Sequence, residues 1–524
     1  MFKYKSILPA KWLVWFFLLL TQSTGAFAST PVTLANSSLG LEFNLADASV
    51  KHWRLPELHD SNGQAQDMAA PTGRLFILNG ELAGKDLREW EGLAGGWKVL
   101  EQSSNTLVLA LEHPDLPFAL KKTWHLREQS WRADFKVDLN LKNLPASASD
   151  HLELQAGPGL GEVPAQGLGM GQSIYSFTEL VYHNADGVET RRLGEEDASN
   201  LSSENTGQTD WVGLQSRYLA LIIGAVNDNA KRATWQANTP ALPEEQAALR
   251  SFQTTVNILL PVSEGARNQT YEWSVFGGGK AYQALTAEKP DLGGLLFSSL
   301  WNWMRALCLG IMHVLQFIQQ IVGSWGIAII LLAVLVRLAM YPIARNAISA
   351  QKKFAAIQAR IQPELQEIRC NYKGGEQSER ILQLYESHQV NPLAGLKPLL
   401  IVLLQVPIFV ALFHLLGQTF ELREASFLWI KTLAEPDQLF PLGIDLPLFG
   451  AYFNLLPVLM AFTTLLSIKL ASVSDGQFSV RQAISSGLMG LGFFILFYSF
   501  PSGMVLYWTV ANLLQVVHQK IAKG

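Results

Sequence analysis

Hydrophobic and polar positions follow different patterns in the two halves of the chain. In the first half, short alternating or β-rich runs are separated by turn-rich stretches, which is typical of strands joined by tight loops. The predicted strands include residues 74–78, 106–111, 118–126, 131–141, 218–226 and 254–260. Repeated short strands over about 260 residues favour a large all-β sandwich, which we place at residues 29–294.

The second half contains long uncharged runs close to the length of a membrane span. Five spans are predicted within a membrane domain at 323–520, namely residues 325–343, 396–416, 451–470, 483–500 and 503–517. A spanning helix needs about 20 apolar residues, so each run is near the required length, although the last is short. The last two are separate, because one helix of about 35 residues would be some 50 Å long and Pro501 interrupts it. The predicted fold class is a multi-spanning α-helical membrane protein with an exported all-β sandwich domain.

Residues 295–322 have apolar side chains at helical spacing and polar side chains on the opposite side. The apolar set is Leu296, Leu300, Trp303, Leu307, Ile311, Val314, Ile318 and Ile321, and the polar set is Asn302, Arg305, His313, Gln316 and Gln320. This pattern predicts an amphipathic helix that lies in the membrane interface. As a span it would place the segment richest in Lys and Arg outside the cell, against the positive-inside rule.

The distribution of basic residues predicts the orientation of the spans. The segment 345–392 carries Lys352, Lys353, Arg360, Arg369, Lys373 and Arg380, whereas the loop 418–450 carries Arg423 and Lys431, and Lys520 and Lys523 lie in the carboxyl-terminal tail. Cytoplasmic loops have an excess of Lys and Arg. We therefore expect the segment 345–392 and the carboxyl terminus to be cytoplasmic, and the β domain to be exported.

The segment 345–392 is predicted to form a cytoplasmic helical hairpin. Its apolar residues recur at helical spacing on both sides of Gly374-Gly375, where the chain breaks. Two roles stay open with equal weight. One is a structural spacer with a solvated charged face, and the other is a docking surface for a ribosome or targeting factor.

Residues 1–28 have the features of an export signal. Lys3, Lys5 and Lys11 precede an apolar run, and a small-x-small triplet ends at Ala28. The apolar run of about nine residues is short for a spanning helix, so we expect cleavage after Ala28. The alternative is an uncleaved signal anchor, which would raise the number of spans from five to six.

The composition supports a membrane protein and excludes several other classes. The 524 residues are 49% apolar and 16% charged, against roughly a quarter charged in an ordinary soluble domain. A net charge of −4 excludes a globally basic nucleic-acid binder, and two cysteines cannot form a disulfide framework or a Cys-rich metal site. The Gly-rich stretch 157–171 lacks the Lys-Ser/Thr of a phosphate loop. We expect no catalytic residue, cofactor, metal or specific nucleic-acid partner.

A single charge, Arg337, interrupts the first predicted span. It lies eight residues before Arg345, which places it roughly 12 Å from the cytoplasmic edge at 1.5 Å per residue. Snorkelling reaches about half that distance, and a buried guanidinium costs a few kcal/mol, so a cavity with water or a carboxylate should surround it. The five predicted spans contain no Asp or Glu, so water is the expected partner. The alternative is an arginine that merely snorkels.

Neutral polar residues accompany this arginine in the other spans. They are Gln405, His414, Asn454, Thr463, Thr464, Ser467, Thr509, Asn512 and Gln515. Trp508, Asn512 and Gln515 share one helical face. Their roles stay open between the lining of a hydrated cavity and hydrogen bonds between helices. A hydrated half-channel with one fixed positive charge would attract an acidic hydrophilic segment into the membrane.

Local motifs in the second half resemble those of a known family. They are the run from Gly326 through Val336-Arg337 to Tyr341-Pro342, Asn391-Pro392-Leu393, Gln405 to Phe409, Glu421-Leu422-Arg423, and Phe500-Pro501-Ser502-Gly503 with Tyr507-Trp508 and Asn512. Together with the order of the segments, they resemble the YidC-type membrane protein insertases of Gram-negative bacteria. The resemblance implies an intramembrane groove that is open to cytoplasm and lipid and closed outside. It makes Arg337 the groove arginine, and Tyr507 and Trp508 the substrate-facing aromatic pair, and Gln405 is carried over as a further groove residue.

The predicted function is an insertase and chaperone for integral proteins of the inner membrane. It would handle nascent membrane proteins in the lipid bilayer, alone or beside the Sec translocon, without covalent chemistry. One rival is a transporter or channel with an exported receptor domain, which predicts inverted repeats that the membrane half lacks. Another rival is an exported sugar-binding or sugar-modifying domain that is anchored to the membrane.

Overall fold

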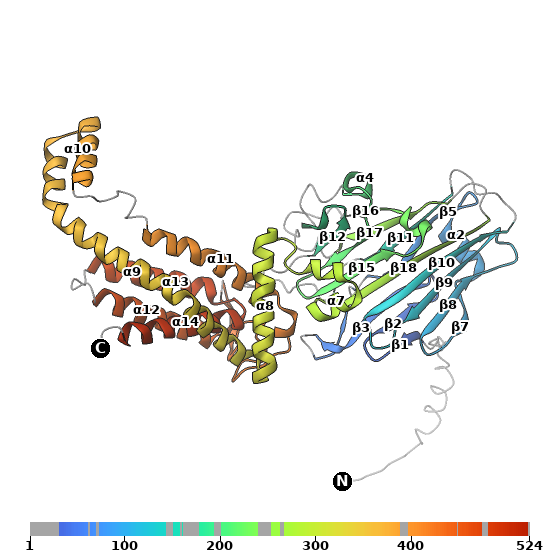
Figure 1. The fold of residues 1–524 in the computed structure, drawn as a ribbon. Coiled ribbons are helices and arrows are strands. Elements are labelled where there is room, and N and C mark those ends of the chain that lie inside the picture. The colour runs from blue at the N-terminus through green and yellow to red at the C-terminus, as the bar shows by residue number, and fades with distance from the viewer. Residues whose placement is uncertain are drawn as a thin grey trace, which may run out of the picture.

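The two halves of the chain fold differently, as the sequence predicts. The computed structural model describes residues 31–521 except 61–62, 70–72, 143–149, 158–159, 161–177, 193–200, 239–252, 263–266, 388–396, 448 and 474–479. The first half forms a large β structure, and the second half is helical, with helix α8 between the two (Figure 1). The predicted signal segment 1–28 and the motif Asn391-Pro392-Leu393 lie outside the described residues, as does most of the Gly-rich stretch.

The β half contains three antiparallel sheets. The largest has the order β13 (Gly187–Arg192), β12 (Glu179–Asn184), β14 (Trp211–Gln215), β15 (Leu219–Ala225), β18 (Asn268–Gly279), β10 (Arg132–Leu141), β9 (Phe118–Leu126), β8 (Thr106–Leu111) and β7 (Lys98–Gln102). The second has the order β16 (Thr234–Asn238), β17 (Thr255–Leu260), β11 (His151–Ala156), β5 (Ile77–Leu82) and β6 (Lys85–Asp86). The third has the order β1 (Val32–Ala35), β2 (Gly40–Asn44), β3 (Ser49–His59) and β4 (Ala65–Asp67). Short helices α2 (Leu87–Ala94), α4 (Ser203–Thr206) and α5 (Asp228–Lys231) connect the strands.

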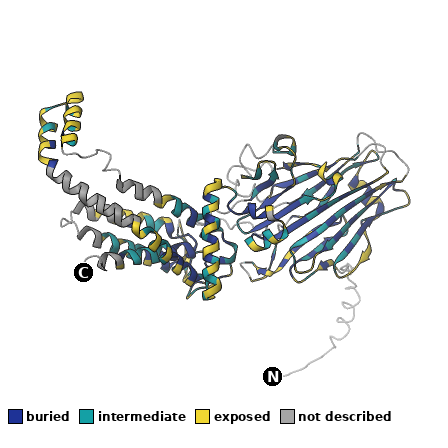
Figure 2. Cartoon of the chain, viewed as in Figure 1, coloured by how far each residue is buried: buried dark blue, intermediate teal, exposed yellow. Residues whose placement is uncertain are grey.

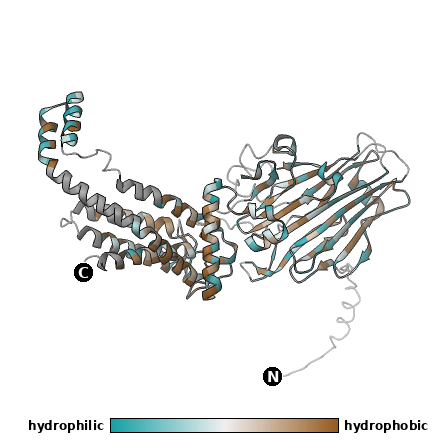
Figure 3. Cartoon of the chain, viewed as in Figure 1, coloured by the Kyte–Doolittle hydropathy of each residue, from teal (hydrophilic) through white to brown (hydrophobic). Residues whose placement is uncertain are grey.

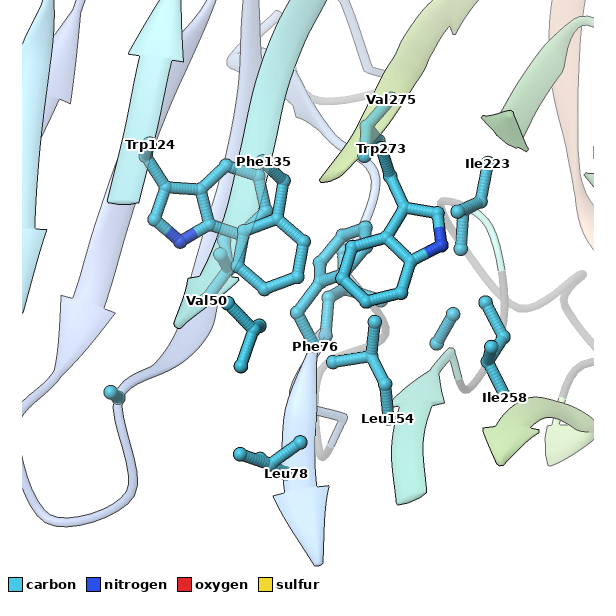
Figure 4. Close-up of a cluster of buried hydrophobic side chains, with 14 of the residues drawn as sticks. Val50, Phe76, Leu78, Trp124, Phe135, Leu154, Ile223, Ile258, Trp273 and Val275 are labelled. Atoms are coloured by element: carbon cyan, nitrogen blue, oxygen red, sulfur yellow. The ribbon is translucent and has the colours of Figure 1, made fainter. Parts of the chain in front are cut away.

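An aromatic core lies between the large sheet and the two smaller ones (Figure 4). Phe135 on β10 pairs in register with Trp124 on β9 and with Trp273 on β18. Its ring stacks on both, with centroid distances of 4.3 Å and 5.6 Å. Residues of β10 alternate between buried and partly exposed because successive side chains of a strand point to opposite faces. The opposing sheets contribute Val50, Phe76, Leu78, Leu154 and Ile258.

Most predicted strands match the structure, and one is misplaced. The strands predicted at 106–111 and 118–126 have those bounds. Those predicted at 131–141 and 254–260 each begin one residue later, and the one predicted at 218–226 is one residue shorter at each end. The strand predicted at 74–78 begins at Ile77 instead. Leu75 forms an isolated bridge with Val50, and Phe76 has a φ of 61°, which is incompatible with a continuous strand.

The helical half contains one long helix and several shorter ones. Its elements are α7 (Tyr282–Glu288), η3 (Pro290–Leu295), α8 (Asn302–Val322), α9 (Trp325–Asn371), α10 (Gly374–Ser387), α11 (Lys397–Gln418), η5 (Phe420–Leu422), β19 (Phe440–Leu446), β20 (Gly450–Phe453), α12 (Leu455–Val473), α13 (Val480–Phe497) and α14 (Ser502–Ile521). The first predicted span and the first arm of the predicted hairpin form one continuous helix, α9, and α10 is the second arm. Ile361 and Leu365 pack against Leu384 between the arms. The span predicted at 451–470 begins at Leu455, because residues 450–453 belong to β20.

Two helices in the described part of the chain are long and apolar enough to cross a membrane. They are residues Asn302–Val322 and Trp325–Pro342, and shorter apolar helices cover Gln405–Gln418, Leu455–Lys469, Gly487–Phe497 and Ser502–Val517. The five-helix core therefore stays a prediction. Helix α8 passes this criterion of length and composition, but it runs across the ends of the other helices (Figure 1). Exposed residues follow it along its length (Figure 2), and hydrophobic positions dominate the described helices beside it (Figure 3).

A second hydrophobic core connects the β half to the helices. It runs from the outer face of the large sheet, through Phe297, to helices α8, α9, α11 and α14. Three glycines at the end of β18, Gly277 to Gly279, lie at this junction. A Cβ atom added to each would lie within 2.3–2.6 Å of a ring atom of Trp53, Trp131 and Phe420 respectively. The glycines therefore allow rings from both halves to lie directly on the backbone of β18.

Candidate functional site

A cavity of about 330 Å³ lies among helices α9, α11 and α14. Its walls are Ala333, Val336, Arg337 and Met340 on α9, Gln405, Ile408, Phe409 and Leu412 on α11, and Tyr507, Trp508, Ala511, Asn512 and Gln515 on α14. We call this space the Arg337 cavity. The wall residues on α9 and those on α14 are more than 150 positions apart in the sequence, and the fold brings them together around this cavity.

Arg337 is the charged residue of this cavity. Its side chain is half-buried, and no Asp or Glu is among the described residues that line the walls. The phenol of Tyr507 lies within electrostatic range of the guanidinium. A guanidinium carries five N–H donors and stays charged, so this arrangement leaves a cation facing a space lined by apolar and neutral polar groups.

Tyr507 and Trp508, the aromatic pair of α14, have different surroundings in the cavity wall. Tyr507 is buried, with 7% of its surface exposed. Trp508 packs edge-on against Phe409 of α11 at 4.8 Å and stacks on Phe497 of α13 at 5.6 Å. The indole therefore fixes the spacing of three helices while it lines the cavity.

Six of the seven predicted site residues line this one cavity. They are Arg337, Gln405, Tyr507, Trp508, Asn512 and Gln515. Thr509 lies outside the wall, and its Oγ1 donates a hydrogen bond to the Val505 carbonyl at 2.7 Å. Gln405 is exposed, so it lies at the rim of the cavity. The apolar wall residues, among them Met340 and Ile408, are not predicted from the sequence, because their pattern is that of any residue in a membrane span.

The loop between α11 and β19 closes one end of the helices. The Ser502 and Gly503 amides at the start of α14 donate hydrogen bonds to the carbonyls of Glu435 and Leu433, at 2.7 Å and 2.8 Å. Asp437 Oδ2 accepts hydrogen bonds from the Leu455 and Leu456 amides at 2.9 Å, which caps α12. The cavity walls are therefore joined at this end by one hydrogen-bonded loop.

Comparisons with known proteins point to one family. A family model described as 60Kd inner membrane protein matches residues 317–524. Membrane protein insertase YidC of Herminiimonas arsenicoxydans is 25% identical over 513 residues, which cover 94% of this chain and 84% of the relative. Membrane protein insertase YidC of Janthinobacterium sp. (strain Marseille) is 24% identical, covering 93% of this chain and 83% of the relative. These matches support a YidC-type membrane protein insertase.

Solved structures give weaker matches. A crystal structure of an active YidC insertase with its first transmembrane domain resolved covers 94% of this chain and 92% of its own, with 16% identity and a TM-score of 0.35. A putative aldose 1-epimerase from Escherichia coli K12 covers 48% of this chain and 99% of its own, with 11% identity and a TM-score of 0.30.

The β half has a second cleft, of about 740 Å³. Asp47, Arg74, Arg88 and Glu91 lie along it. Lys122 is fully buried nearby and donates hydrogen bonds to the Asp47, Ala48 and Phe76 carbonyls at 3.1–3.2 Å. Burial lowers the pKa of Lys122 to about 8, and the nearby Glu91 and Asp47 carboxylates oppose this shift. The lysine therefore connects β9 to the turns just before β3 and β5, and it is not among the residues that line the cleft.

Proposed function

We propose that this chain inserts and folds integral membrane proteins of the inner membrane through the Arg337 cavity. The observation that carries the proposal is one half-buried guanidinium in a cavity whose described walls hold no carboxylate. A cation in such a space attracts an acidic hydrophilic segment of a substrate. The neutral polar side chains of Gln405 and Gln515 at the walls offer hydrogen bonds to the backbone of that segment.

Transfer of the substrate helix into lipid supplies the driving force. Each favourable apolar residue contributes about 0.3–0.6 kcal/mol on the biological insertion scale, so a helix of about 20 residues gains several kcal/mol. The cavity lowers the barrier, because the hydrophilic segment crosses part of the bilayer beside water and Arg337 rather than in hydrocarbon. The reaction needs no covalent step and no cofactor.

The proposed topology places the β half in the periplasm and the carboxyl terminus in the cytoplasm. Helix α8 lies in the outer interface, and α9, α11, α12, α13 and α14 cross the membrane. The basic arms of α9 and α10 extend into the cytoplasm, where a ribosome or targeting factor delivers nascent membrane proteins. A Sec translocon is a second proposed partner, and the lipid bilayer receives the released helix.

The proposal is tested with the purified full chain in liposomes. A short single-span protein with an acidic tail is synthesised beside these vesicles, and insertion is scored by protection from added protease. Protection well above that of empty liposomes is expected. Protection at the level of empty liposomes would contradict autonomous insertion and would favour a partner-dependent chaperone or the transporter reading.

A further inference from the structure

The three walls of the Arg337 cavity end on one loop, residues 419–435. Gly503 at the start of α14 lies so close to this loop that an added Cβ would be 3.0 Å from the Leu433 carbonyl oxygen. Gly326 at the start of α9 lies still closer to the loop, where an added Cβ would be 2.1 Å from the Phe427 ring. The third wall, α11, runs into the loop at Gln418. The loop therefore determines how the three outer helix ends are spaced.

Arg217 of the β half binds this loop and the end of α11 at once. It lies in the turn between β14 and β15. Its Nε donates a hydrogen bond to the Gly417 carbonyl at 2.7 Å, and its Nη2 donates one to the Ala434 carbonyl at 3.0 Å. The guanidinium lies over the ring of Tyr218, 4.6 Å from its centroid. The side chain is thus held in one orientation, and its planar fork matches two carbonyls.

The two carbonyl partners of Arg217, those of Gly417 and Ala434, lie close to different walls of the cavity. Gly417 belongs to the last turn of α11, whose carbonyls lack helical partners and carry partial negative charge. It lies five positions after the wall residue Leu412, which is roughly 7.5 Å along the helix. Ala434 lies between Leu433 and Glu435, whose carbonyls accept the hydrogen bonds from Gly503 and Ser502. Through these bonds Arg217 connects the α11 wall to the α14 wall.

We propose that Arg217 is a positioning residue of the insertase: from the exported domain, its fork fixes the outer ends of α11 and α14 and so keeps the Arg337 cavity closed on that side. The inference rests on the proposed function for its effect on insertion. Its structural part, the spacing of the two helix ends, stands without it. Two charge-assisted hydrogen bonds are lost in Arg217→Ala, which shifts the equilibrium toward a detached loop by roughly 10- to 100-fold.

The experiment uses the full chain in proteoliposomes and three variants. Arg217→Ala removes the fork, Arg217→Lys keeps the charge with one point donor, and Arg232→Ala is the matched control. Arg232 is an exposed arginine of the β half that also donates to a backbone carbonyl, that of Asp228 at 3.3 Å. Hydrogen exchange is followed at the Ser502 and Gly503 amides, and insertion and leakage of an entrapped dye are measured on the same vesicles.

In Arg217→Ala we expect exchange at Ser502 and Gly503 to quicken at least ten-fold, dye leakage to rise and the insertion rate to fall several-fold. Arg217→Lys should be intermediate, because an ammonium does not bind both carbonyls in a fixed plane. Arg232→Ala should match the wild type. Hydrogen exchange at the amides of β10 and β18 reports whether the sandwich itself has unfolded in Arg217→Ala. If it has unfolded, the positioning role is judged from the comparison of Arg217→Lys with the wild type.

If Arg217→Ala stays folded, unchanged hydrogen exchange and unchanged insertion in this variant would overturn the proposal. If Arg217→Ala unfolds the sandwich, wild-type exchange and insertion in Arg217→Lys would overturn it. A wild-type chain that fails to insert would contradict the proposed function, whereas faster exchange in Arg217→Ala would still support the positioning role. The two failures are therefore distinguishable.

Discussion

Asn512 on α14 donates a hydrogen bond from Nδ2 to Oγ1 of Thr464 on α12, at 2.7 Å. The Thr464 hydroxyl donates in turn to the Met460 carbonyl at 2.7 Å, so its oxygen is free to accept from the amide. The sequence left two roles open for the polar face of α14, which are the lining of a hydrated cavity and hydrogen bonds between helices. The contact of Asn512 with Thr464 is a hydrogen bond between helices. The residue nevertheless lines the Arg337 cavity, and it therefore connects the shape of the cavity to the packing of α12.

Asn512→Ala and Thr464→Ala should each destabilise the helix pair by about 0.5–2 kcal/mol, because interhelical hydrogen bonds in membranes have this range. The double variant should cost little more than either single variant. The measurement is a double-mutant cycle on unfolding by a denaturing detergent. Thr463→Ala is the matched control, since Thr463 bonds to the Met460 carbonyl and has no bond to Asn512 among the described contacts. Additive losses in the double variant would show that the bond makes no net contribution.

Gly279→Ala should weaken the junction between the two halves. Its Cβ would lie 2.3 Å from the Phe420 ring, so the ring must move, at a cost of about 1–3 kcal/mol. Gly224→Ala on β15 is the control, since the nearest atom would be 3.7 Å away. We expect a lower midpoint of thermal unfolding for Gly279→Ala alone. Equal midpoints for the two variants would mean that Phe420 does not hold the junction.

The stability of the chain should rise between about pH 8 and pH 10 through Lys280. Burial lowers the pKa of Lys280 from 10.5 to about 8, and the carboxylate of Glu179 opposes this shift. Between these values the unfolded lysine holds a proton that the folded one has lost, so the free energy of unfolding increases with pH, by roughly 3 kcal/mol at most.

Thermal unfolding of wild type and Lys280→Met at both ends of this pH range tests the assignment. Lys122 has a pKa lowered in the same direction, so both proteins should gain stability as the pH rises. The wild type should gain more, because the variant lacks one of the two lysines. An equal gain in both would exclude Lys280 as a source of the pH dependence.

The proposed interfacial placement of α8 predicts a labelling pattern. Asn302 and Gln320 are exposed on the predicted polar side of this helix and lie 18 positions apart, which is roughly 27 Å along it. Asn302→Cys and Gln320→Cys should both react with a membrane-impermeant thiol reagent from the outside, because the polar side of an interfacial helix faces water. The exposed Cys370 lies on the part of α9 that the proposed topology places in the cytoplasm, and it should react from the inside alone. Labelling of the two α8 positions from opposite sides would make α8 a span.

The sequence predicts the helices and strands better than the contacts that hold them together. Alternation in the strands 106–111 and 118–126 gave their bounds, because each strand has one buried face. Arg337 was found because a charge in an apolar run is rare. Arg217 gave no signal, since its partners Gly417 and Ala434 lie 200 and 217 positions away and are backbone carbonyls. Contacts of this kind depend on the assembled fold and leave no local pattern.

The central claim is that the charge of Arg337 guides acidic segments, and one comparison tests it most directly. Insertion rates of two substrates that differ in tail charge alone, one acidic and one neutral, are measured for wild type, Arg337→Lys and Arg337→Ala in the same liposomes. We expect Arg337→Ala to slow the acidic-tailed substrate about ten-fold or more relative to the neutral one, and Arg337→Lys to retain much of the preference. An equal loss for both substrates would contradict the electrostatic account.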